Sequence, residues 1–148
     1  MEVYNGFNAC CSTKVNVSRL KYTNAMTTTA QTVFTANTTN ANLGSKLVSL
    51  VCVNGDVAAR VIRVSIASGG TNYYLGTANV AASSGLDPTG ANNQVNLMNS
   101  TIMPGLPIDN DGQPYILLAN GDTIQVESTS TITNNAVFVY FSAIGSDF

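Results

Sequence analysis

Histidine is absent from this chain of 148 residues, and so is tryptophan. Without histidine the commonest general base of enzymes is missing, and neither a Ser–His–Asp nor a Cys–His arrangement can form. The short glycine pair at Gly69 and Gly70 leads into a strand pattern, whereas a phosphate-binding loop leads into a helix. The sequence therefore predicts a protein that is not an enzyme and has no catalytic residues.

Charged residues are scarce, at 9% of the chain against about 25% in a typical domain. Residues 1–63 hold all six bases and two acids, whereas residues 64–148 hold six acids and no base. This asymmetry gives a bipolar surface, suited to head-to-tail attachment, only if the fold keeps the two halves apart. The bases are too few and too dispersed for a phosphate footprint, so we expect no nucleic-acid partner.

Three cysteines are too few for a disulfide framework, and with no histidine they complete no zinc site. Cys10 and Cys11 are adjacent, and Cys52 lies in an apolar run that predicts a buried thiol. The first residues lack the basic and apolar pattern of a signal peptide, and no apolar run reaches the ~20 residues of a membrane span. We expect a protein that is made in a reducing compartment and has no membrane partner.

Asparagine and threonine are abundant, with 18 and 17 residues. Threonine favours strands and asparagine favours tight turns, and no helical apolar stripe extends over ten residues. We predict an all-β domain over residues 14–148, an antiparallel β-sandwich or jelly roll of about eight strands, preceded by an extended N-terminal arm, 1–13. The expected strands are 14–22, with Val15, Val17 and Leu20 on one side, and then 26–36, 46–53, 57–66, 71–80, 114–118, 122–128 and 136–143, with a short segment at 95–98.

Two Asn-Gly pairs stand between strand patterns, at Asn54-Gly55 and Asn120-Gly121. Asn-Gly supplies the positive φ values of a type I′ turn and is the strongest short-range signal for a hairpin. The sequence therefore predicts that 46–53 pairs with 57–66, and that 114–118 pairs with 122–128. Residues 67–70 are expected to turn the chain into the strand at 71–80.

Most of the eight acids lie beside turn glycines, as Asp56, Asp111 and Asp122 do, and turn formation accounts for them. Asp109-Asn110-Asp111-Gly112 begins like a calcium loop but has Asn120 in place of the bidentate glutamate at the twelfth position. We interpret it as a turn, with calcium binding by Asp109 and Asp111 as the alternative. No metal site and no cofactor are expected.

Residues 117–126 (LLANGDTIQV), the Ser/Thr-rich link that follows and the closing run VFVYF resemble the C-terminal hairpin and last strand of small tailed-phage virion proteins. The similarity covers residues 46–148, and residues 1–45 have no counterpart in it. It implies a capsid decoration, or cement, protein that binds the major capsid protein on the capsid surface of the virion. Such proteins are commonly homotrimers, and this one would assemble in the host cytoplasm.

Two segments are candidates for partner contacts if this resemblance holds. Tyr4 and Phe7 would anchor the arm to the capsid, and a proline loop would pack between subunits through Met103, Pro104, Leu106 and Pro107. Both segments could instead be simple connectors. The alternative functions are a neck, tail or fibre component of the virion, or a receptor- or carbohydrate-binding module that stacks sugars on Tyr22, Tyr73, Tyr74 and Tyr115.

Overall fold

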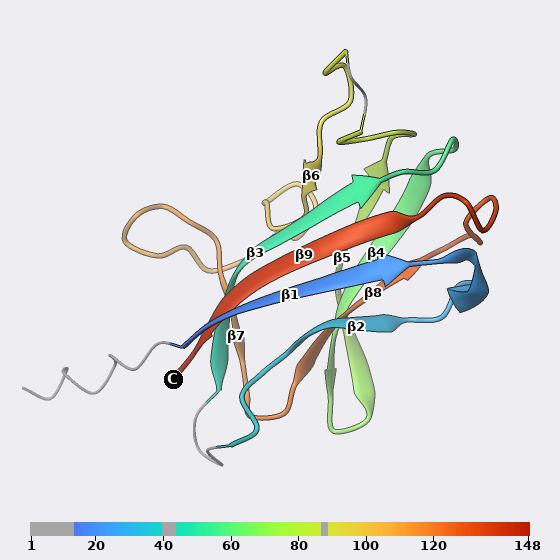
Figure 1. Ribbon diagram of the computed structural model, residues 1–148. Helices are drawn as coiled ribbons and strands as arrows, with labels where there is room; N and C mark the ends of the chain where they lie inside the picture. The colour runs from blue at the N-terminus through green and yellow to red at the C-terminus, as the bar shows by residue number, and fades with distance from the viewer. Residues whose placement is uncertain (1–13, 40–43, 87–88) are drawn as a thin grey trace, which may run out of the picture.

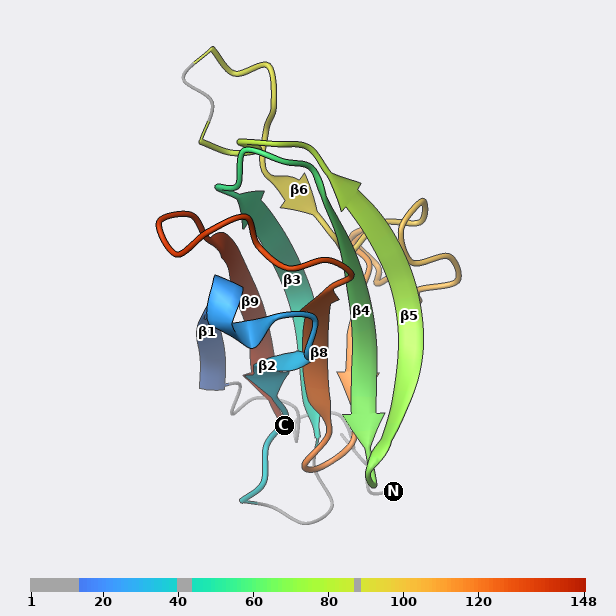
Figure 2. The same cartoon turned by 90° about the vertical axis from the view of Figure 1, so that its right-hand side faces the viewer.

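The computed structural model describes residues 14–39, 44–86 and 89–148, and in these ranges the protein is a β-sandwich (Figure 1). Two antiparallel sheets lie face to face, which is clearest in the view of Figure 2. The strands are β1 (Lys14–Tyr22), β2 (Gln31–Thr35), β3 (Ser45–Asn54), β4 (Arg60–Ser68), β5 (Thr71–Val80), β6 (Val95–Asn96), β7 (Ile116–Leu118), β8 (Thr123–Ser128) and β9 (Val139–Asp147). No helix among the described residues is long and apolar enough to span a bilayer.

The strand order is that of a jelly roll. Sheet A has the order β1-β9-β3, and the short strands β6 and β7 both pair with the edge of β3 that faces away from β9. Sheet B has the order β2-β8-β4-β5. If the two-residue β6 is set aside, the eight remaining strands pair first with last and so on inward, β1–β9, β2–β8, β3–β7 and β4–β5, alternately in the two sheets. This nested wrapping defines the jelly roll and confirms the predicted fold class.

The core fills the space between the sheets with the inward side chains of alternating strands. Its largest fully buried members include Tyr22, Phe34 and Phe141, and the rings of Tyr22 and Phe141 meet edge to face with centroids 6.4 Å apart. Gly145 on β9 makes room for this packing, since a Cβ there would lie 2.6 Å from the end of the Phe34 ring. Cys52 is buried in the same core, as predicted, and burial raises the pKa of its thiol to about 12.

The predicted hairpin at Asn54-Gly55 is wrong, because β3 belongs to sheet A and β4 to sheet B. The turn is an arch over the end of the sandwich. The buried Asn54 side chain donates hydrogen bonds to the carbonyl oxygens of Ala58, Val80 and Ala81 at 3.0–3.1 Å. Gly55 does not have the positive φ of a type I′ turn. Glycine is needed here because a Cβ would lie 2.7 Å from the Phe138 carbonyl oxygen.

The second predicted hairpin is wrong for the same reason, since β7 lies in sheet A and β8 in sheet B. The turn itself is present: the Asp122 amide donates to the Ala119 carbonyl over 3.1 Å, and Gly121 has a φ of 79°. The tight hairpin lies instead at the predicted turn 67–70, where Gly69 and Gly70 both have positive φ and join β4 to β5. Two residues with positive φ are what a type I′ loop requires.

Several strand predictions change at their ends, among them 57–66, which becomes β4 at Arg60–Ser68, and 95–98, which pairs only at Val95–Asn96. A short 3-10 turn (Asn24–Met26) stands where residues 26–36 were expected to begin a strand, and β2 starts only at Gln31. The last strand is displaced toward the C-terminus, to Val139–Asp147. The segment expected at 114–118 forms a strand only at Ile116–Leu118. The predicted arm, 1–13, lies outside the described residues.

Candidate docking surface on sheet A

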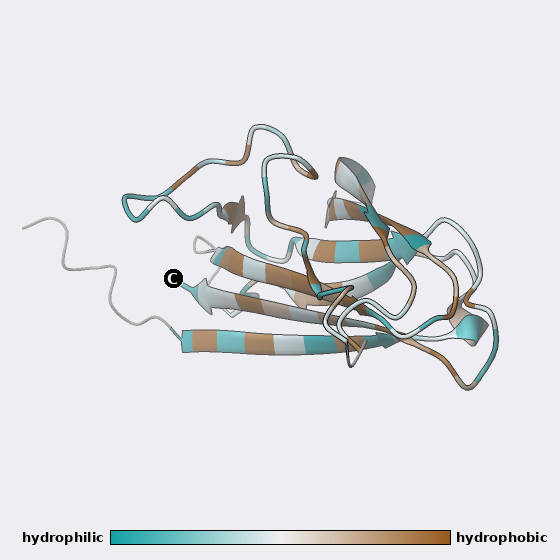
Figure 3. Ribbon diagram, turned by 90° about the horizontal axis from the view of Figure 1, so that it is seen from above, coloured by the Kyte–Doolittle hydropathy of each residue, from teal (hydrophilic) through white to brown (hydrophobic). Residues whose placement is uncertain are grey.

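The outward face of sheet A is unusually apolar. Along β1 the residues that point to solvent include Val15 and Val17, which are 64% and 54% exposed. Figure 3 shows apolar and polar positions alternating along this strand. Leu20, expected on the same side as the two valines, instead points toward the core, because it lies an odd number of residues from them along the strand. Eight outward apolar side chains of sheet A make up what we call the sheet A face: Val15, Val17, Val48, Val51, Val53, Leu117, Tyr140 and Ile144.

The strand register brings these side chains together. Val17 of β1 lies opposite Ile144 of β9, and Tyr140 of β9 lies opposite Val53 of β3. A β-bulge at Val48 places both Val48 and Ser49 on the outer side of β3, since Leu47 and Ser49 pair with the consecutive residues Gly145 and Ile144. Cross-strand neighbours on one face lie about 5 Å apart. The sheet A face therefore extends over the three long strands β1, β9 and β3 and reaches Leu117 on β7, opposite Lys46, and it is not a scatter of exposed residues.

The outer face of sheet B can be compared with the sheet A face within the same protein. It is closer to the ordinary pattern of antiparallel sheets, in which polar residues point outward, although Val61 and Tyr74 are exposed on it. Its exposed or half-buried positions include Thr35, Thr77, Asn79 and Gln125, together with the ion pair of Arg63 and Glu127 at 2.7 Å. Low charge alone thus does not make an outer face apolar in this protein, and the composition of the sheet A face is specific to that side.

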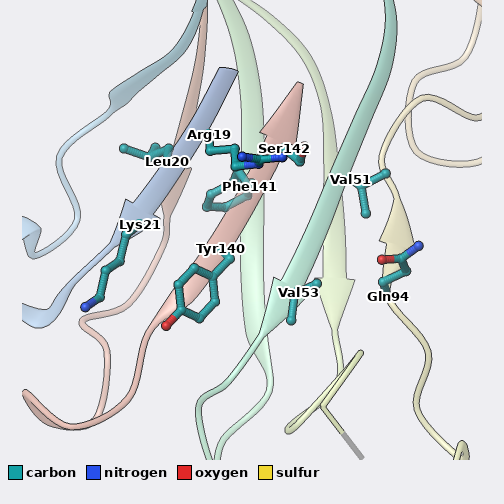
Figure 4. A pocket seen from close by; sticks show the side chains of 9 residues that line it. All are labelled: Arg19, Leu20, Lys21, Val51, Val53, Gln94, Tyr140, Phe141 and Ser142. Atoms are coloured by element: carbon teal, nitrogen blue, oxygen red, sulfur yellow. The ribbon is translucent and has the colours of Figure 1, made fainter. Parts of the chain in front are cut away.

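A groove of about 390 Å³ crosses the sheet A face (Figure 4). Val51 and Val53 of β3 and Tyr140 of β9 line it, with Gln94 at the side of β3 and the bases Arg19 and Lys21 at the side of β1. The Lys21 ammonium lies 3.5 Å from the centroid of the Phe138 ring. The groove thus has an apolar base with two cations along one side, which suits an apolar chain segment that also carries negative charge.

Three of the six basic side chains form ion pairs within the protein, and the other three can bind an acidic partner. Arg60, Arg63 and Lys46 are paired with Asp56, Glu127 and Asp109. Lys14, Arg19 and Lys21 have no ion pair within the described residues, and all three lie on β1. The uneven distribution of charge along the sequence therefore appears in the fold as one basic strand, β1, at the edge of sheet A.

The Asp56–Arg60 pair is buried beside the arch between β3 and β4, with the two side chains 0% and 8% exposed. Arg60 donates to Asp56 over 2.6 and 2.8 Å, and also to the hydroxyls of Ser130 and Thr133. Burial by itself raises the pKa of Asp56, but hydrogen bonds from Thr133, Arg60 and the Ala58 amide outweigh it and lower the pKa to about 2. Asp56 is more than the turn residue that the sequence predicted. The spacing of four residues from an arginine was the signal that could have identified the pair.

The Asp109 carboxylate is engaged within its own loop. It accepts hydrogen bonds from the amides of Asp111 and Gln113 at 3.1 and 2.9 Å and pairs with Lys46 at 3.4 Å. These contacts, the Gln113 amide first, lower the pKa of Asp109. In the part of the chain that the structure describes, no three potential metal ligands of the His, Cys, Asp and Glu types cluster. This local bonding agrees with the interpretation of 109–112 as a turn.

The structure separates the residues that were predicted to contact a partner. Tyr4 and Phe7 lie outside the described residues. Met103 is 1% exposed and belongs to the core, where it contributes to the packing over Gly76, so its predicted contact role is corrected. Pro104 and Pro107 are exposed and Leu106 packs partly against the core, so their role stays a prediction.

The tyrosines of the carbohydrate-binding alternative do not form one platform. Tyr22 is fully buried and its hydroxyl donates to the Thr29 carbonyl at 2.8 Å. Tyr73 and Tyr74 are exposed on β5 of sheet B, whereas Tyr115 lies beside Lys46 at sheet A. The sequence pattern could not separate these positions, because an exposed and a buried tyrosine look alike in a strand.

Comparison with known proteins adds no assignment. No protein-family model matches the sequence, and no curated protein matches it.

Proposed function

We propose that this protein is a structural, non-catalytic component of a virus particle that docks on the major capsid protein through the sheet A face. The observation that carries the proposal is the contrast between the two outer faces of the sandwich. An antiparallel sheet of a free domain keeps its outer face polar, and connected apolar patches on a soluble protein mark docking sites. The jelly-roll wrapping supports the same conclusion, because it is a common architecture of viral capsid domains.

The energetics of the sheet A face suit such a contact. Six of its eight apolar side chains are 37–64% exposed, whereas Val51 and Val53 are half-buried. Covering the eight contributes about 1 kcal/mol each on average before the cost of association. The polar residues among them are Ser49, Ser142 and Ser146, which are cheaper to desolvate than charges, and the bases Arg19, Lys21 and Lys46. Lys46 is paired with Asp109, so a partner would need negative charge only beside Arg19 and Lys21. The binding free energy of a single contact of this kind is moderate. On a particle with many equivalent positions, linked copies would bind far more tightly than one.

The first experiment is a copy-number measurement. Quantitative mass spectrometry of gradient-purified particles should find this chain at a number comparable with that of the major capsid protein. A few copies per particle would instead favour the neck, tail or fibre alternative. Absence from the particles would overturn the proposal.

A second experiment locates the surface. Val17→Glu and Ile144→Glu place charges at neighbouring positions of the sheet A face, and the full chain carrying them should no longer co-sediment with capsids that lack the protein. Val61→Glu is the matched control, since Val61 is a 37% exposed valine on the outer side of sheet B. Equal loss of binding in the control, or full binding by the sheet A variants, would contradict the assignment of the surface.

The predicted arm is tested separately. If Tyr4 and Phe7 anchor the protein to the capsid, deletion of residues 1–12 should leave a folded domain that co-sediments less than the full chain does. Unchanged co-sedimentation would assign the whole contact to the sandwich and remove the arm from it. The homotrimer implied by the phage resemblance is tested by the mass of the full chain in solution.

A further inference from the structure

The sandwich protects its strand edges unequally. An edge strand exposes unpaired backbone groups, and proteins commonly block such edges with charges, prolines, short strands, β-bulges or covering loops. In sheet A, β1 carries Lys14, Arg19 and Lys21, and the opposite edge is made of strands of only two and three residues, β6 and β7. In sheet B, β2 has five residues. These three edges show recognised protection.

The fourth edge, β5, is different. It is ten residues long (TNYYLGTANV) and contains neither a charged residue nor a proline. It is the last strand of sheet B, next to β4 (Figure 2). Within the described residues, no backbone hydrogen bond outside the β4–β5 ladder involves residues 71–80. Ile102 and Met103 approach Gly76, while Tyr73 and Tyr74 remain 57% and 60% exposed.

We propose that β5 pairs antiparallel with β5 of a second copy, so that two B sheets join into one continuous sheet across a twofold axis. The absence of charge favours self-pairing, because no like charges meet when an uncharged strand lies beside its own copy. Self-pairing of β1 would instead gather six bases in one strand pair, and repulsion between like charges on neighbouring strands opposes it. The second copy is therefore a fitting occupant for β5 but not for β1.

The side chains of β5 complement one another in this arrangement. Antiparallel pairing about a twofold axis places the half with Tyr73 and Tyr74 opposite the half with Thr77 and Asn79 of the other copy. Aromatic and β-branched cross-strand neighbours stabilise a sheet. Leu75 is a β-bulge, since Val64 and Ser65 of β4 pair with Gly76 and Tyr74. A bulge interrupts pairing along an edge, so the proposed ladder is confined to the two places where 71–74 of one copy meets 77–80 of the other.

One added strand pair buries less surface than the interfaces of stable dimers, which cover about 1,600 Å² in total. The predicted contact is consequently weak and depends on concentration, as any self-association does by mass action. It differs from the homotrimer implied by the phage resemblance, because a twofold contact is isologous whereas a trimer needs a heterologous one.

Sedimentation velocity of the full chain tests the proposal. The wild-type protein should change from monomer to dimer as its concentration rises toward about 1 mM, and Thr77→Lys should abolish the dimer by placing a charge on the β5 edge. The matched control is Thr35→Lys, the same substitution at an exposed threonine of β2, the opposite edge of sheet B. A dimer that persists in Thr77→Lys, a wild-type protein that stays monomeric throughout, or a trimer would each overturn the proposal.

Hydrogen exchange provides a readout that does not depend on a substitution. Amides of residues 71–80 should exchange more slowly at high protein concentration than at low concentration, while those of β1 should not change. The docking variant Val17→Glu should still dimerise, because the two surfaces lie on different sheets. Failure of the β5 contact and failure of capsid docking are therefore distinguishable.

Discussion

The Asp56–Arg60 pair shows how much of the charge in this protein is structural. Both groups are buried and each is fully hydrogen-bonded, so removing one partner leaves the other as an unpaired charge in the interior. We expect Asp56→Ala to lower the free energy of unfolding by about 3–5 kcal/mol. Denaturant unfolding followed by circular dichroism measures this loss.

A double variant is the control for this prediction. Replacing both partners, as in Asp56→Ala with Arg60→Leu, also removes the arginine charge that the single variant leaves unpaired, so part of the lost stability should return. If the double variant is as unstable as the sum of the two single variants, the pair is not the source of the effect. That result would attribute the loss to the hydrogen bonds from Thr133 and Ala58 alone.

The pH dependence of stability follows from the same residue. Its folded pKa, about 2, lies below the ordinary value of 3.8, so ionised Asp56 stabilises the fold at all pH values above about 4. This contribution, about 2 kcal/mol for a shift of this size, is lost as the pH falls from about 4 to 2. Urea midpoints measured over this range should fall more steeply for the wild type than for Asp56→Ala. Equal slopes would show that Asp56 does not carry the transition.

At the scale of elements, the two Asn-Gly pairs show what a local pattern can and cannot predict. The pattern located both turns correctly, but it could not say that each turn joins two different sheets. Strands that face one core from opposite sides have the same period of two, so alternation carries no information on sheet membership. The contacts that define the arch at Asn54 come from Val80, Ala81 and Phe138, which are distant in sequence.

The arch gives a prediction at this scale. Asn54→Ala removes four side-chain hydrogen bonds: three to the carbonyls of Ala58, Val80 and Ala81 and one from the Asp56 amide. It should therefore cost about 2–4 kcal/mol. Asn110→Ala is the matched control, an exposed turn asparagine whose loss should stay within about 0.5 kcal/mol. Thermal and urea denaturation of both variants measure the difference. Similar small losses would mean that the arch is held by its backbone bond from Gly55 to Phe138 and not by Asn54.

At the scale of the whole molecule, apolar residues form two populations that the sequence could not tell apart. Val15, Val17 and Leu20 lie within one short strand pattern, yet two face solvent and one faces the core. Which face of a strand is inward depends on the sheet that covers it, and that partner is set by the jelly-roll topology. The fold class was therefore predictable from turns and alternation, whereas the sheet A face required the three-dimensional register.

Substitutions of exposed apolar residues should affect docking, whereas substitutions of buried apolar residues should affect stability. The double variant Val17→Glu with Ile144→Glu changes exposed side chains, and its two opposed glutamates should cost no more than about 1 kcal/mol. Its melting temperature should therefore fall by only a few degrees while capsid co-sedimentation is lost. Leu50→Ala, in the fully buried core, should lose about 2–5 kcal/mol of stability and still bind at temperatures where it remains folded. The measurements are calorimetry and co-sedimentation on the same preparations. A large drop in the melting temperature of the double variant would mean that the sheet A face helps to hold the isolated fold together, and the case for a docking surface would then fail.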